Sequence, residues 1–152
     1  KPEEKQSSKY FVVPVFYNGS SYGVYAIPTF TSLNEKTTLK VVEKNALAKS
    51  NDLKATEEIQ NFLKTFFGSY AADSKDKLSY ILEDKKHQYG LQNSLKFVEV
   101  EESEVYEGKK DNQFIVDCKV RFEDPDSGSQ IQNNYRLTVE KKNDQYVVTK
   151  IN

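Results

Sequence analysis

The chain has 152 residues, 37% of them hydrophobic, including nine Phe and ten Tyr. A chain of this length can bury about two thirds of its unfolded surface in one domain, so the core needs neither disulfides nor metal. The 22 basic and 23 acidic residues nearly cancel, which argues against a dedicated nucleic-acid surface, and no nucleic-acid partner is expected.

The N-terminal part is predicted to be an arm outside the main sheet. Residues 1–9 are charged and small, typical of a disordered lead-in. Two β-rich runs, residues 10–17 and 22–30, flank Asn18-Gly19, the preferred pair for a tight hairpin turn. Pro14 and Pro28 interrupt these runs. Because proline cannot donate to a strand ladder, the hairpin should not be central to any sheet.

A polar segment, residues 31–54, follows as a linker with room for one brief strand near Leu39–Val42. The change in composition divides the chain into a hairpin arm with linker over residues 10–50 and a compact domain over residues 51–152. The arm could also be the tail of a preceding domain. The chain begins with Lys1 and contains no Met, which we interpret as a processed protein or a fragment.

The compact domain opens with a predicted helix over residues 52–70. Apolar residues recur there at three- and four-residue steps, forming one stripe: Ile59, Phe62, Leu63, Phe66, Phe67 and Tyr70. Thr56 is the expected N-cap and Gly68 the expected stop signal. A second, shorter helix is predicted from Ser74 to about Lys86.

From Ser94 onward the apolar period changes from 3.6 to 2, which indicates strands. Val98 and Val100 alternate with glutamates, and three further alternating runs follow around residues 114–122, 131–140 and 146–151. Short, turn-rich connections join these runs, so the strands should be antiparallel neighbours in a four-strand meander. The predicted fold is α+β, a curved sheet wrapped over the helices.

Few residues suggest chemistry. His87 is the only histidine, with Glu83 and Asp84 one turn before it, and a surface position is expected rather than catalysis. Cys118 lies between Val116 and Val120 on an apolar strand face, as a small buried hydrophobe would. No catalytic, cofactor-binding or metal-binding residues are predicted, because no phosphate loop, nucleophile elbow or metal motif occurs.

Two surface features have competing interpretations. The first is an acidic stretch that lacks the spacing of a calcium loop and is better explained by carboxylates on the solvent face of an edge strand: Glu99, Glu101, Glu102, Glu104 and Glu107. The second is a tyrosine cluster in the arm: Tyr17, Tyr22 and Tyr25. These tyrosines could form an interaction surface or could be ordinary strand packing.

The order of a helix, a short helix and a long meander resembles the NTF2-like cone. Within that superfamily, ATEEIQNFLKTFFGSYAADSKDKLSYILED and VDCKVRFEDPDSGSQIQNNYRLTVEKKNDQYVVTKIN resemble the C-terminal domain of the TcpC family of Gram-positive conjugative-transfer proteins. The resemblance covers residues 52–152. It implies a non-enzymatic component of a type IV secretion channel, similar to the assembly factors of the VirB class.

The same resemblance implies partners and a location. We expect contacts with other channel proteins, a homo-oligomer that is either a dimer or a trimer, and an extracytoplasmic domain in the cell envelope whose membrane anchor lies outside this sequence. Enzymes such as isomerases and dehydratases also use this cone, so the alternative is an NTF2-like small-molecule-binding protein or a lyase- or isomerase-type enzyme. The residues predicted to line the cone are nearly all apolar, which favours a filled interior: Phe62, Phe66, Phe114, Val116, Cys118, Val120, Tyr135 and Leu137.

Overall fold

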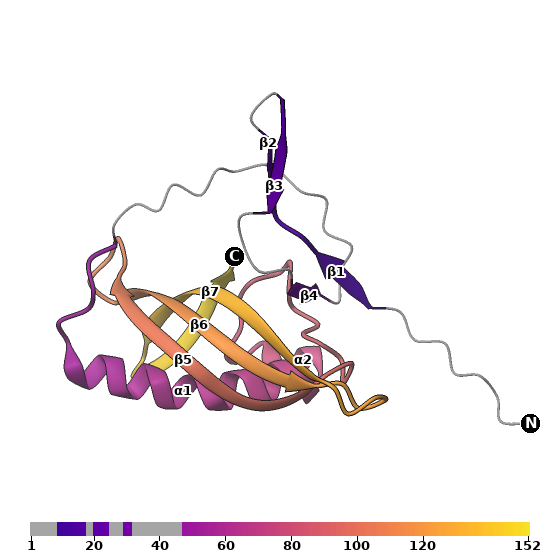
Figure 1. Ribbon diagram of the computed structural model, residues 1–152. Helices are drawn as coiled ribbons and strands as arrows, with labels where there is room; N and C mark the ends of the chain where they lie inside the picture. The colour runs from indigo at the N-terminus through magenta and orange to yellow at the C-terminus, as the bar shows by residue number, and fades with distance from the viewer. Residues whose placement is uncertain (1–8, 18–19, 25–28, 32–46) are drawn as a thin grey trace, which may run out of the picture.

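The computed structural model describes residues 9–17, 20–24, 29–31 and 47–152. A long helix lies against one face of a curved four-stranded sheet, and a small β-arm extends from the sheet (Figure 1). The brief strand expected near Leu39–Val42, residues 1–8 of the expected lead-in and the Asn18-Gly19 turn lie outside the described residues. No helix among the described residues has both the length and the apolar character to span a membrane.

Helix α1 (Leu53–Ala72) follows the apolar stripe but not the predicted ends. Asp52 is the N-cap, because its backbone is extended and its side chain accepts the Ala55 amide at 2.9 Å. Thr56, the predicted cap, already lies in the first turn, where its hydroxyl donates to the Asp52 carbonyl. The helix also continues through Gly68 and ends at Ala72, with Asp73 as the C-cap in extended backbone conformation.

The second helix is much shorter than predicted. Helix α2 covers only Lys75–Leu78. Beyond it, the backbone of residues 81–83 pairs with the last strand: the Val148 amide donates to the Ile81 carbonyl at 2.8 Å, and the Glu83 amide donates to the Val148 carbonyl at 2.9 Å. These groups are therefore not available for continued helical hydrogen bonds.

Four strands form the predicted antiparallel meander, in the order β5-β6-β7-β8. Their bounds are Lys96–Glu107, Gln113–Glu123, Gln130–Lys142 and Gln145–Ile151. Asn143 and Asp144, both at positive φ, make the tight turn between β7 and β8. Register shifts in β5 between Phe97 and Glu99 and between Val100 and Glu102 change the predicted alternation. Val98 is consequently 43% exposed instead of facing the core.

The core lies between the apolar stripe of α1 and the concave face of the sheet. Phe67 is fully buried, and its ring centroid lies 5.0 Å from Tyr135 of β7 and 6.3 Å from Phe122 of β6. One outer edge of the sheet is also covered: the Ser50 amide donates to Val105 of β5, and the Glu107 amide donates to Ala48. The fold is a helix-filled cone, as expected.

The N-terminal arm, residues 10–31, contains two small ladders. Strand β1 (Tyr10–Val12) pairs with β4 (Thr29–Thr31), and β2 (Val15–Tyr17) pairs with β3 (Tyr22–Val24). The first ladder forms the base of the arm, because β4 lies against β7. The second ladder forms the tip and projects away from the four-stranded sheet (Figure 1).

Candidate functional site

The inside of the cone is packed with side chains. Six of the eight residues predicted to line it are buried: Phe66, Phe114, Val116, Cys118, Val120 and Leu137. The other two, Phe62 and Tyr135, are partly buried and pack against this core. Phe62 lies at the margin of the core beside β8, where its ring centroid is 6.0 Å from those of both Phe66 and Tyr146.

Three polar side chains lie inside, and they do not form a reactive centre. Burial raises the pKa of the Cys118 thiol and of the Tyr135 phenol, so both groups are protonated at neutral pH. Asn133, only 1% exposed, donates to the Tyr135 hydroxyl at 3.4 Å. Asn133 was not among the residues predicted to line the cone, although the two-residue step from Ile131 to Tyr135 places it there.

His87 does not have the predicted surface position, because it is only 9% exposed. Its Nδ1 lies 3.0 Å from Asp84 Oδ2, which also accepts the Ile151 amide at 2.9 Å. Burial opposes ionisation of Asp84, but the hydrogen bonds from Ile151, His87 and Lys86 outweigh it and lower the pKa of this carboxyl. The His87–Asp84 pair therefore connects the loop after α2 to the last strand, and its role is to stabilise the fold.

The acidic stretch lies on β5, and four of its five carboxylates are exposed: Glu99, Glu102, Glu104 and Glu107. Basic side chains from neighbouring segments pair with three of these exposed carboxylates. Arg121 pairs with Glu99 and Lys119 with Glu102, both across the β5–β6 ladder, and Lys49 lies 3.3 Å from Glu104. In the part of the chain that the structure describes, no group of three or more acidic, His or Cys side chains could hold a metal ion.

The outer face of the sheet has a shallow depression of about 520 Å³ that lies between two cross-strand pairs of charged side chains. One rim is formed by Asp117 and Arg136, whose bidentate pair has both N···O distances at 2.6 Å. Glu102 and Lys119 form the opposite rim. Because the charges along both rims are compensated, the depression has no strong preference for a cation or an anion.

A second polar cluster lies where α1 meets the β7–β8 hairpin. The Tyr146 hydroxyl donates to Glu58 Oε2 at 2.7 Å, and Lys141 Nζ lies 3.2 Å from the same oxygen. Burial and the adjacent carboxylate raise the pKa of Tyr146, while the hydroxyl and Lys141 lower the pKa of Glu58. Two adjoining depressions, of about 220 and 620 Å³, share these three side chains. The cluster is open to solvent and contains an acid, a phenol and an amine.

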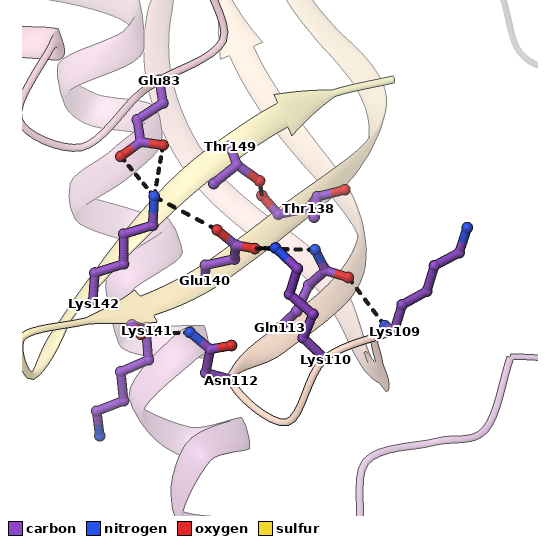
Figure 2. A network of polar contacts seen from close by, with 10 residues as sticks. All are labelled: Glu83, Lys109, Lys110, Asn112, Gln113, Thr138, Glu140, Lys141, Lys142 and Thr149. Carbon is purple, nitrogen blue, oxygen red and sulfur yellow. Dashed lines mark hydrogen bonds and ion pairs between the residues drawn. The ribbon is translucent and has the colours of Figure 1, made fainter.

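Next to this cluster, a buried carboxylate connects three parts of the chain (Figure 2). Glu140 of β7 is 7% exposed and accepts Gln113 of β6 at 3.1 Å and Lys110 of the β5–β6 turn at 3.4 Å. Lys142 lies 3.6 Å from Glu140 and 2.8 Å from Glu83. Burial opposes the ionised form of Glu140, but Lys110 and the other donors outweigh it and lower its pKa. This network joins neighbouring segments through compensated charges.

The arm carries much of the exposed apolar surface. Among the described residues, nine large hydrophobic side chains are exposed, and five of them lie in the arm: Tyr10, Phe11, Val13, Tyr17 and Val24. Tyr17 is 46% exposed and stands opposite Tyr22 in the β2–β3 ladder. Tyr25, the third tyrosine of the predicted interaction surface, lies outside the described residues.

A protein-family model matches nearly the whole chain. The sequence profile of the family described as "Conjugative transposon protein TcpC" matches residues 1–149. The chain is 29% identical over 140 residues to "Uncharacterized protein YddB" of Bacillus subtilis (strain 168), a match that covers 91% of this chain and 38% of the relative.

A solved structure described as "Ntf2 like protein involved in plasmid conjugation" matches with a TM-score of 0.64 and 23% identity. That match covers 93% of this chain and 56% of the solved chain, and it establishes the NTF2-like fold. The chain thus spans between about two fifths and three fifths of the length of these two relatives.

Proposed function

Because the chain belongs to the TcpC family of conjugative transposon proteins, we propose that it is a non-catalytic assembly component of a Gram-positive conjugative type IV secretion system. It acts through protein–protein contacts, and the arm supplies a contact surface. The observation that carries this proposal is the distribution of exposed apolar side chains, which gather on the arm. Clustered exposed apolar residues are typical of protein interfaces.

The packing of the cone supports the same function. An enzyme of this fold needs a pocket with ionisable groups inside, but here the centre is occupied by rings such as Phe67, Phe122 and Tyr135. The Cys118 thiol and the Tyr135 phenol are held protonated by burial. Neither group is poised to act as a nucleophile or a base at neutral pH.

The proposed setting is the cell envelope. The domain lies outside the cytoplasm, is held by a membrane anchor beyond this sequence, and works as a homo-oligomer with other channel proteins. The outer face of the sheet suits such a crowded setting, because cross-strand pairs such as Asp117 with Arg136 compensate its charges. Compensated charge disfavours nonspecific electrostatic association and leaves apolar contact to determine binding.

Site-specific crosslinking in donor cells tests the contact surface. A photo-crosslinking side chain replaces Tyr17 of the full-length protein, and a matched variant carries it at Tyr80, which is 79% exposed near α2. We expect discrete protein adducts from position 17 and few from position 80. Tyr17→Ala should lower the transfer frequency about ten-fold at unchanged protein level, whereas Tyr80→Ala should not. Equal adducts from both positions, or normal transfer with Tyr17→Ala, would contradict the proposal.

The Glu58–Lys141–Tyr146 cluster supports a second candidate, a small-molecule-binding or lyase-type protein. It places a carboxylate and a phenol side by side at an open depression, where both can hydrogen-bond to a small polar molecule. Tyr146→Phe removes the hydroxyl and keeps the ring that packs on Phe62. If that variant lost transfer in donor cells while its thermal stability stayed within a few degrees of the parent, this candidate would replace the assembly function.

A further inference from the structure

One charged contact fastens the beginning of the arm to the sheet. Lys9 Nζ lies 3.3 Å from Asp124 Oδ1 and 3.8 Å from Asp126 Oδ2, both in the turn between β6 and β7. The side chains of Lys9 and Asp124 are only 19% and 18% exposed. A partly buried ion pair is stronger than a fully exposed one, although 1 M salt still weakens it, so this contact can position a segment.

The turn holds Asp124 ready for this contact. Asp124 Oδ1 also accepts the Asp126 amide at 2.9 Å, and the Asp124 carbonyl accepts the Gly128 amide at 2.8 Å. The Asp126 amide and Lys9 lower the pKa of the Asp124 carboxyl despite its partial burial. The carboxylate is therefore ionised and fixed in place by the turn itself. Forming the contact then costs conformational entropy of the Lys9 side chain but little of the Asp124 side chain.

The contact lies where it controls the direction of the arm. Strand β1 begins at the residue after Lys9, and its partner β4 lies against β7. The β2–β3 ladder, with Tyr17 and Val24, is joined to this base through residues 13 and 14 on one strand. An isolated two-stranded ladder is only marginally stable, so the orientation of the tip depends on how firmly the base is held.

We propose that Lys9 with Asp124 and Asp126 forms an ionic latch that fixes the base of the arm on the β6–β7 turn. The latch sets the direction in which the tip presents Tyr17, so its role in transfer rests on the proposed function. Opening the latch releases the base of the arm without unfolding the cone.

A double-mutant cycle measured by amide hydrogen exchange tests the latch in the 152-residue chain. Lys9→Gln removes the ammonium, and Asp124→Asn removes the charge but keeps an oxygen for the Asp126 amide. Each variant should raise exchange of the β1 and β4 amides about five-fold, and the double variant should exchange no faster than either single one. Lys49→Gln is the control, since Lys49 makes a similar but exposed pair with Glu104.

Salt provides the second readout. Raising the salt from 0.05 M to 1 M should increase exchange of the arm in the parent and have little effect in Lys9→Gln. Additive effects in the cycle, or unchanged exchange in Lys9→Gln, would overturn the latch whatever the transfer phenotype. If Lys9→Gln loosens the arm and Tyr17→Ala leaves transfer normal, the latch stands and the proposed function falls.

Discussion

Replacing Asp84 with asparagine is expected to loosen the last strand and to reduce the acid sensitivity of folding. The Asp84 side chain is 11% exposed. One of its oxygens accepts the Ile151 amide at 2.9 Å and lies 3.0 Å from His87 Nδ1, and the other accepts the Lys86 amide at 2.9 Å. Asparagine keeps the shape but turns one of the two acceptors into a donor that faces another N–H.

The expected loss is about 1–3 kcal/mol of unfolding free energy at pH 7, the usual cost of one unsatisfied, largely buried hydrogen-bonding group. The pH dependence follows from the pKa of Asp84, which is lowered in the folded protein. A carboxyl of this kind contributes its stability above its unfolded pKa of about 3.9 and loses it as the pH falls through the folded value. The difference in unfolding free energy between the parent and Asp84→Asn should therefore decrease below about pH 4.

Urea unfolding followed by circular dichroism at pH 7, 5, 4 and 3 measures this gap. Asp144→Asn is the matched control, because Asp144 is exposed in the β7–β8 turn and asparagine tolerates its positive φ. Exchange of the Ile151 amide should rise in Asp84→Asn only. The reasoning fails if Asp84→Asn is as stable as the parent at pH 7, or if the gap stays constant down to pH 3.

Three further substitutions test other parts of the fold by urea unfolding at pH 7. Gly90→Ala should lower the free energy of unfolding by about 3 kcal/mol or more, because Gly90 has φ +58° and a Cβ there would lie 2.3 Å from the Tyr70 carbonyl oxygen. Gly128 has φ +71° but open space around it, so Gly128→Ala should lower the free energy of unfolding by only about 1 kcal/mol. Equal costs would refute the role of the close approach. Asp52→Ala should lower the free energy of unfolding by about 1 kcal/mol, because it removes the N-cap of α1. A larger loss of stability in Thr56→Ala would show that Thr56 is the N-cap instead. Phe67→Ala should lower the free energy of unfolding by about 3–5 kcal/mol. A loss smaller than that of Phe62→Ala would show that Phe67 is not central to the hydrophobic core.

The corrections to the candidate site concern residues whose partners are distant in the chain. Asp84, which pairs with His87 one turn away, also accepts the amide of Ile151, 64 positions beyond His87, and this contact with the last strand is not indicated by the sequence around His87. The short α2 has the same origin, because strand β8 takes the backbone hydrogen bonds of residues 81–83. Asn133 differs from these cases, since the alternation along β7 was sufficient to place it inside.

The sequence by itself determined the helix stripe from Ile59 to Tyr70 and the antiparallel order of the four strands, because amphipathic periods and short turns act between close neighbours. These local patterns were enough to predict a curved sheet over the helices, and the resemblance to a known superfamily implied the cone. Only the tertiary structure decided which carboxylates meet which cations, where β5 bulges, and how Lys9 meets Asp124 across 115 positions. Such contacts depend on the relative placement of elements distant in the chain, which the pattern within any one element does not encode.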